Sequence, residues 1–397
     1  MEKFAILRTP HEIYYGRGAL DNIGMEAVTR GNKALIVSDK VMAGLGYVSQ
    51  CQDHLKKEGI DSKVYPGIES EPTDRYVSEA LQLLKGKQCD LVVSIGGGSC
   101  IDTAKAIAVL ANNEGYIGDY RPGRKKVKNK PLPHIAIPTT GGTGSEATDV
   151  TVITNTTDDI KMMIKQPPFM PEVAIVDPML TVSSPQTITA ATGVDALSHA
   201  IEAYLSKRSH PMTDTFALSA MKLIVKNLLT AYKNGENIDA REAMSLGALQ
   251  AGIAFTNASV CLVHGMSRPI GALFHVPHGY SNAMLLPAVL EFSKEACIDR
   301  LADLGRIFKP DQSLPNEEAA DIAVESVKEL CSKLNIPNLK DWGIEKSAFD
   351  QVIGKMAADA IDSGSPANNP RVPGQKELEE LYQICFDYQF KRKAEVK

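Results

Sequence analysis

The stretch DLVVSIGGGSCIDTAKAI, residues 90–107, indicates the fold of the first part of this 397-residue chain. A short β-branched run, typical of a buried parallel strand, leads into three consecutive glycines and then into an apolar-periodic helix that we expect to begin at Ser99. Glycine lets the backbone approach a ligand closely, and the free amides at a helix start attract negative charge. The stretch therefore predicts a strand, a phosphate-binding turn and a crossover helix.

The same alternation continues on both sides of this stretch. Short β-branched runs, separated by helical patterns and turns, lie at residues 34–39, 62–68, 90–98, 134–140 and 174–178. After Ser184 these runs stop, and long apolar-periodic helices continue to the end of the chain. Such alternation predicts a doubly wound parallel sheet with flanking helices. We therefore predict an α/β NAD-binding domain over residues 1–184 and an all-helical metal-binding and catalytic domain over residues 185–397.

Composition excludes several classes of protein. Charged residues make up 23 % of the chain and hydrophobic ones 44 %, with a net charge of −5, as in an ordinary soluble enzyme. The densest basic cluster, residues 121–130, lies among proline and glycine without aromatic residues, so we expect no nucleic-acid partner. No secretory signal and no apolar run of about 18 residues is seen, so we expect no membrane partner. Seven dispersed cysteines without a CxxC pair fit reduced thiols in the cytoplasm.

One aspartate and three histidines have the spacing of a metal site. Asp195 and His199 are four residues apart in an unbroken helical pattern, which places them on one helix face about 6 Å apart. His264 ends another apolar segment, and His278 follows a turn built from Pro277 and Gly279, so both can converge on that pair. One carboxylate with three imidazoles suits Zn or Fe(II) better than Mg or Ca. The alternative is that these are ordinary packed or surface residues.

Two further features lie at the carboxyl ends of predicted strands, where parallel sheets bind ligands. A second glycine-rich turn, PTTGGTGSEAT at 138–148, offers hydroxyls to a ribose or phosphate. Asp39 ends the strand 34–39, where a carboxylate could hold the adenosine ribose and repel a 2′-phosphate, which favours NAD over NADP. A simple turn or cap is the alternative for Asp39. Ser99 and Asp102 can likewise form a capping box, S-x-x-D, at the helix start.

Four motifs carry a resemblance to a known family: GGGSCIDTAK (96–105), PTTGGTGSE (138–146), GVDALSHAIEAY (193–204) and the HGM…PHG stretch (264–279). With these motifs in this order, the chain resembles the iron-containing (group III) alcohol dehydrogenases over nearly its full length. The resemblance implies the architecture that this family shares with dehydroquinate synthase. It also implies NAD and a divalent metal, usually Fe(II), with Zn as the other candidate, and a homo-oligomer, commonly a dimer.

The resemblance also implies site residues by position. The metal ligands would be Asp195, His199, His264 and His278. Phe255 falls where the family lines its substrate pocket. The cofactor contacts would be Asp39, Gly97, Gly98, Ser99, Asp102, Thr139, Thr140, Thr143 and Lys161, with Leu180 near the nicotinamide.

This chain departs from the family's motif at one position beside the site. Many relatives read HGMAHPLG where this chain reads HGMSRPIG, so that Arg268 replaces a histidine that is a candidate proton relay. Arginine stays charged and cannot relay protons, which leaves His275 as the nearest alternative. If the stretch is helical, Arg268 shares a face with His264 and could bind a negatively charged group of the substrate. The alternative is an internal salt bridge, for instance to Glu71.

These features together favour an oxidoreductase that interconverts a small primary alcohol and its aldehyde. A metal with an open position binds the substrate oxygen, and hydride passes between the substrate carbon and the nicotinamide. If Arg268 binds a negatively charged group of the substrate, that group is a carboxylate, sulfonate or phosphonate. Two alternatives stay open at this point: a lyase of the dehydroquinate synthase type, which also pairs NAD with a metal, and a non-catalytic metal-binding protein.

Overall fold

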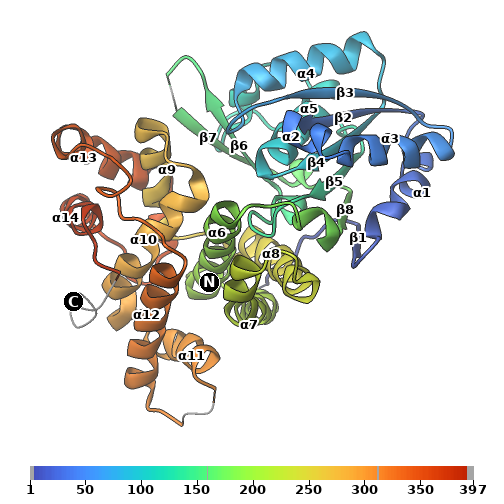
Figure 1. Ribbon diagram of the computed structural model, residues 1–397. Helices are drawn as coiled ribbons and strands as arrows, with labels where there is room; N and C mark the ends of the chain where they lie inside the picture. The colour runs from blue at the N-terminus through green and yellow to red at the C-terminus, as the bar shows by residue number, and fades with distance from the viewer. Residues whose placement is uncertain (1–3, 159, 311–312, 391–397) are drawn as a thin grey trace. The chain divides into compact units, whose positions relative to one another are not determined.

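The computed structural model describes residues 4–158, 160–310 and 313–390 (Figure 1). Contacts divide them into two compact units, residues 8–184 and residues 185–390, and residues 4–7 group with the second. The predicted domain boundary placed residues 4–7 in the first unit. They precede the first strand, so the sheet does not hold them, and they carry no periodic signal from which their packing could be predicted.

The first unit is built on a parallel sheet, as predicted. Its strand order is β1-β8-β5-β4-β2-β3, and every pairing is parallel. The strands are β1 (Glu12–Tyr15), β2 (Lys33–Asp39), β3 (Asp61–Ile68), β4 (Leu91–Gly96), β5 (His134–Pro138) and β8 (Val173–Val176). The sequence analysis missed β1 because this edge strand has only four residues and buries none of them fully.

Helices cover both faces of this sheet. Along β2, Leu35 and Val37 pack into one buried cluster with residues of α4 and α5, whereas Ala34 and Ile36 pack into another with residues of α1 and α3. This alternation is the period of two that a strand buried on both faces requires. The helices are α1 (Ile23–Val28), α2 (Lys40–Gly44), α3 (Tyr47–Lys57), α4 (Asp74–Gly86) and α5 (Gly98–Asn112), and the 3₁₀ turns are η1 (Ala19–Asn22), η2 (Ile117–Tyr120), η3 (Ser145–Ala147), η4 (Pro167–Phe169) and η5 (Pro178–Thr181).

A two-stranded antiparallel ribbon also belongs to the first unit. It consists of β6 (Val150–Asn155) and β7 (Ile160–Lys165), and it follows directly on the second glycine-rich turn. The sequence analysis predicted no strands here, because two short half-polar runs carry a weaker signal than the buried strands of the main sheet. The ribbon and that turn are both bonded to Asp102 of α5, which accepts from the backbone N–H of Val152 and from Ser145 Oγ.

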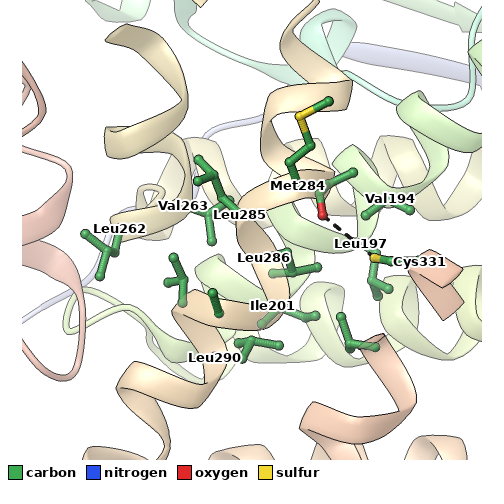
Figure 2. Packing of buried hydrophobic residues seen from close by; sticks show 14 of the residues in the cluster. Val194, Leu197, Ile201, Leu262, Val263, Met284, Leu285, Leu286, Leu290 and Cys331 are labelled. Atoms are coloured by element: carbon green, nitrogen blue, oxygen red, sulfur yellow. Dashed lines mark hydrogen bonds between the residues drawn. The ribbon is translucent and has the colours of Figure 1, made fainter. Parts of the chain in front are cut away.

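The second unit is helical, as predicted. It comprises α6 (Gln186–Leu205), α7 (Pro211–Lys233), α8 (Ile238–Ala258), α9 (Leu262–Phe274), α10 (His278–Ser293), α11 (Ile298–Phe308), α12 (Asn316–Lys333), α13 (Lys346–Asp362) and α14 (Gln375–Phe386), with 3₁₀ turns η6 (Lys294–Ala296) and η7 (Pro366–Asn368). Figure 2 shows part of its core, where Leu197 and Ile201 of α6 lie near Leu286 and Leu290 of α10. This packing fixes α6 against α10, two helices that carry functional residues.

Among the described residues, none of the helices has by itself both the length and the apolar character of a membrane span. Helices α8 and α9 have them only when taken together, and the chain bends by 101° between the two.

Candidate metal centre and cofactor-binding turns

Asp195 and His199 lie on the same face of α6, as their spacing predicted. Both are buried, and His199 Nδ1 is 4.0 Å from Asp195 Oδ2. The segment from Gly193 to Leu205 is buried along its whole length, so this part of α6 runs through the interior of the unit. The carboxylate and the imidazole are therefore held in place by packing on all sides.

His264 and His278 come from the starts of two other helices. His264 is in the first turn of α9, so the prediction that it ends an apolar segment was wrong. His278 is the first residue of α10, and Pro277 is the N-cap of that helix. Gly279 is the second residue of α10, so the predicted turn built from Pro277 and Gly279 was wrong. A Cβ on Gly279 would lie 2.8 Å from the carbonyl oxygen of Ala191. Glycine is needed there because α10 begins directly against α6.

The four predicted ligands converge on one point. One ligand atom from each of Asp195, His199, His264 and His278 lies within 4.8 Å of all the others. Asp195 Oδ1 is 3.6 Å from His264 Nε2 and 3.9 Å from His278 Nε2. Three of the four residues are buried, and the side chain of His278 is 37 % exposed. One carboxylate and three imidazoles at this spacing fit a divalent transition metal.

Burial and mutual charge set the protonation of these groups. Burial lowers the pKa of His199 to about 3 and outweighs the attraction of Asp195, so this imidazole keeps a free lone pair at neutral pH. Its Nδ1 is buried and has no hydrogen-bond partner among the described residues. Burial alone would raise the pKa of Asp195, but the three histidines outweigh it and bring that pKa below its usual range. Both groups are thus in the form that binds a cation.

Two residues that the sequence analysis missed orient these ligands. Asn282 is fully buried, and its Nδ2 donates to Asp195 Oδ1 at 2.6 Å and lies 3.1 Å from Nε2 of both His264 and His278. Glu202 Oε2 accepts from His264 Nδ1 at 2.5 Å. Burial lowers the pKa of His264, but Glu202 and Asp195 more than compensate and raise it to about 9. Helical spacing was the available signal, since Asn282 is four residues from His278 and Glu202 seven from Asp195.

Phe255, which the resemblance places in the substrate pocket, lies beside the four predicted metal ligands. Its ring on α8 stacks on the imidazole of His199, with ring centroids 4.2 Å apart and planes inclined by 15°. The phenyl ring gives one side of the centre an apolar wall and restrains the orientation of the His199 ring.

Arg268 is close enough to the metal centre to act on its charges. It lies one helical turn after His264 on α9, and its guanidinium donates to Ser365 Oγ at 3.0 Å. Burial lowers the pKa of Arg268 to about 10, so it remains charged at neutral pH, and its positive charge helps to lower the pKa of His199. Glu71, suggested as a salt-bridge partner of Arg268, forms an ion pair with Lys161.

His275, the predicted alternative proton relay, ends α9. It is exposed and has a left-handed backbone with φ of 54°. It lies in the short connection between α9 and α10, three residues before predicted ligand His278.

The first glycine-rich turn starts α5 one residue earlier than predicted. Gly97 is the N-cap, and Ser99 already lies in the first turn, so the predicted capping box of Ser99 and Asp102 was wrong. The Asp102 carboxylate instead accepts from Ser145 Oγ at 2.5 Å and from the backbone N–H of Val152 at 2.8 Å. Asp102 therefore ties the helix to the second turn and to β6.

The two glycine-rich turns lie against each other at the ends of β4 and β5. The N–H of Thr139 donates to the carbonyl of Gly96 at 3.0 Å. A Cβ on Gly98 would lie 2.9 Å from Thr143 Cγ2, and one on Gly97 would lie 3.8 Å from Thr140 Cγ2. The structure thus brings together the predicted cofactor residues of both turns, and glycine at position 98 permits their close approach.

Lys105 of α5, which the sequence analysis did not identify, is hydrogen-bonded to the second glycine-rich turn and to the residues that follow it. Its fully buried ammonium group donates to Ser145 Oγ and Thr148 Oγ1, both at 2.8 Å, and to the Val150 carbonyl at 2.7 Å. A lysine in a helix is usually solvated, so no feature of the sequence alone marked this one as buried.

The remaining predicted cofactor residues have structural partners of their own. Asp39 caps α2, because its Oδ1 accepts from the Met42 N–H at 2.8 Å, as the cap interpretation held. Its Oδ2 accepts from Cys100 Sγ at 3.7 Å, which places the carboxylate beside the first turn. Lys161 is on β7, and Leu180 is buried in η5 among side chains of the sheet.

Comparison with known proteins is consistent with this geometry. Residues 10–178 match the family described as iron-containing alcohol dehydrogenase, and residues 189–386 match the Fe-containing alcohol dehydrogenase family, C-terminal. The chain is 37 % identical over 382 residues to the 1,3-propanediol dehydrogenase of Citrobacter freundii, covering 95 % of this chain and 97 % of that one. It is 38 % identical over 369 residues to the NAD-dependent methanol dehydrogenase of Bacillus methanolicus, covering 92 % and 96 %.

The fold matches solved structures at similar levels of identity. The crystal structure of sulfoacetaldehyde reductase from Bifidobacterium kashiwanohense in complex with NAD⁺ superposes with a TM-score of 0.86 at 30 % identity, covering 97 % of this chain and 100 % of that one. One family match covers most of the sheet unit and the other most of the helical unit, and each of these similar proteins matches both units. The chain belongs to the iron-containing alcohol dehydrogenase family.

Proposed function

We propose that this protein is an NAD-dependent, metal-assisted oxidoreductase that interconverts a small primary alcohol and its aldehyde by hydride transfer. The observation that carries the proposal is the convergence of Asp195, His199, His264 and His278 on one point. When bound, a divalent metal supplies a Lewis acid for the substrate oxygen, and the nicotinamide accepts or donates the hydride. Asp195 and the three histidines would hold the metal.

The protein's own residues position the reactants. Phe255 excludes water from one side of the centre and offers an apolar surface to the substrate carbon chain. The paired turns at the ends of β4 and β5 present backbone N–H groups and threonine hydroxyls to the cofactor's phosphates. We propose that Gly97, Gly98, Ser99, Thr139, Thr140 and Thr143 contact the cofactor directly, whereas Asp102 and Lys105 hold these turns in place.

We propose NAD over NADP as the cofactor and Fe(II) as the metal. The carboxylate of Asp39 ends β2 beside the first glycine-rich turn, where it would repel a 2′-phosphate. The family is described as iron-containing, which favours Fe(II). Zn fits the same ligands and binds such sites more tightly than Fe(II), so metal availability decides occupancy.

We further propose that the substrate carries a negative charge. Arg268 places a half-buried positive charge one turn from predicted ligand His264, close enough to affect the pKa of His199. Guanidinium groups recognise carboxylates and sulfonates with two parallel hydrogen bonds. The similarity to a sulfoacetaldehyde reductase supports an acidic aldehyde of this kind. His275 would serve as the proton relay, because Arg268 cannot release a proton at working pH.

We also propose that the enzyme is a cytoplasmic homo-oligomer. All seven cysteines lie in the described part of the chain and are free, which favours a reducing compartment. In the sheet unit, apolar side chains of Met25 and Val28 on α1 are 58 % and 49 % exposed, a surface that a second copy could cover. Light scattering of the purified chain measures its mass.

A panel of small primary alcohols with NAD, and of aldehydes with NADH, tests the proposed function. The absorbance of NADH is followed while the metal content is measured on the same sample. We expect NADH formation from alcohols and NADH consumption with aldehydes. Absence of turnover across the panel, with metal and cofactor both bound, would contradict an oxidoreductase.

A further inference from the structure

Glu202 is a buried carboxylate that lies in line with two metal ligands on α6. Asp195, His199 and Glu202 occupy positions i, i+4 and i+7, which form a single stripe along a helix. Only 4 % of its side chain is exposed. The buried stripe therefore continues one turn beyond the ligand pair and ends in a second carboxylate.

Both oxygens of Glu202 are engaged by the start of α9. Oε1 accepts from the Val263 N–H at 2.6 Å, and Oε2 accepts from His264 Nδ1 at 2.5 Å. The Val263 N–H is among the first four amides of α9, which have no partner within the helix. A negative charge there is also favoured by the helix dipole. The Glu202 carboxylate thus accepts a hydrogen bond from a free backbone N–H at the start of α9 and a second one from the imidazole of His264 in the same turn.

This contact decides which nitrogen of His264 can bind a metal. An ionised carboxylate accepts hydrogen bonds and donates none, so Nδ1 must carry the proton. In the neutral ring that binds a metal, the lone pair then resides on Nε2, the atom that lies 3.6 Å from Asp195 Oδ1 within the ligand cluster. A carboxylate behind a ligand histidine also makes the ring a stronger base toward the metal.

We infer that Glu202 is a positioning residue of the metal centre, which holds the tautomer and ring orientation of His264 and strengthens its bond to the metal. The inference rests on the proposed function and goes beyond it, because Glu202 acts through His264 and is not one of the four predicted ligands. Its charge also offsets part of the positive charge that a divalent metal leaves on one carboxylate and three imidazoles.

Metal affinity of the purified full-length chain tests this inference. Zn(II) affinity is measured by competition with a chelator for the wild type, Glu202→Gln and Glu26→Gln. Glutamine keeps the size of the side chain and removes its charge. Glu26 is the matched control, because it is also a buried glutamate with two side-chain partners, Tyr14 and Arg30, but lies on α1 of the sheet unit. We expect Glu202→Gln to weaken Zn(II) binding about 10- to 100-fold and Glu26→Gln to leave it unchanged.

Nitrogen-15 NMR of histidine-labelled, Zn(II)-loaded wild type provides a second readout that needs no folded variant at position 202. We expect a hydrogen-bonded Nδ1 proton on His264, identified by its absence in His264→Asn. A His264 that carries no proton on Nδ1 would overturn the inference. So would equal Zn(II) affinities of wild type and Glu202→Gln, with the proposed function left intact. A wild type that binds no metal would overturn the proposed function and this inference with it.

Discussion

Arg268 and Ser365 are joined by a hydrogen bond of 3.0 Å between α9 and the segment that follows α13. The bond holds a half-buried guanidinium one turn beyond predicted ligand His264. A guanidinium this near the predicted ligands can pair with a carboxylate or sulfonate, which motivates a role toward an anionic substrate.

Replacing Arg268 by alanine should raise KM for an acidic aldehyde about tenfold to a hundredfold, which corresponds to about 1.4 to 2.8 kcal/mol. KM for a neutral aldehyde of equal size should change little, because only the acidic one loses a charged partner. Steady-state kinetics with both substrates measures the difference. Arg306→Ala, at a partly exposed arginine of α11, is the control. Equal losses on both substrates would make Arg268 structural.

Replacing His264 or His278 by alanine should abolish stoichiometric metal binding while NAD still binds. Each substitution removes one of four converging ligands, whereas the glycine-rich turns of the sheet unit stay intact. Metal analysis after dialysis and a fluorescence titration with NADH measure the two properties. His11→Ala changes an exposed histidine and serves as the control. Full metal content and normal activity in either variant would remove that histidine from the ligand set.

Asp39→Asn should shift cofactor use toward NADP by about tenfold, or about 1.4 kcal/mol. Asparagine still caps α2 through its side-chain oxygen, so the variant removes the charge and keeps the helix start. The ratio of kcat/KM for NADP to that for NAD measures the shift. Asp39→Gly, which also loses the cap, should shift the ratio in the same direction and lower stability. A ratio unchanged in both variants would show that Asp39 does not face the ribose.

His134 should make the protein less stable in mild acid. Burial and, to a smaller extent, the charge of Lys105 lower its pKa to about 3, so the folded chain keeps it neutral. Below its unfolded pKa of about 6.5, only the unfolded chain takes up this proton. The free energy of unfolding should therefore fall by up to about 1.4 kcal/mol per pH unit as the pH drops from about 6.5 toward 3.

Urea denaturation from pH 7 to pH 4 measures this slope. The variant His134→Gln can keep the hydrogen bond with Ser94 Oγ but cannot titrate. The dependence of its free energy of unfolding on pH should therefore be weaker than that of the wild type by up to about 1.4 kcal/mol per pH unit. Identical slopes for wild type and variant would show that His134 does not contribute to acid sensitivity.

The sequence predicted those parts of the fold whose signal is local. Strands β2 and β4 are buried on both faces and read as unbroken β-branched runs, so they were found, whereas the half-exposed β1 and the β6–β7 ribbon were not. Asp195 and His199 could be paired because helical spacing alone brings them together.

Residues that depend on tertiary contacts could not be recognised in this way. Glu202 and Lys105 are charged residues in helices, and such residues are usually solvated. Their burial follows from where α9 and the second glycine-rich turn pack, which one sequence does not reveal. The start of α5 was misplaced at Ser99 for a related reason, because serine is a common N-cap and the structure uses the backbone of Gly97 instead.

Turnover is expected to depend on a metal held by Asp195 and the three histidines. The most direct test strips the protein with a chelator and returns Fe(II) without oxygen in measured steps, while NADH formation from a substrate alcohol is followed. The expectation is that no turnover occurs without metal and that the rate rises in proportion to bound metal up to one ion per chain. A rate independent of metal content, with NAD bound, would contradict it.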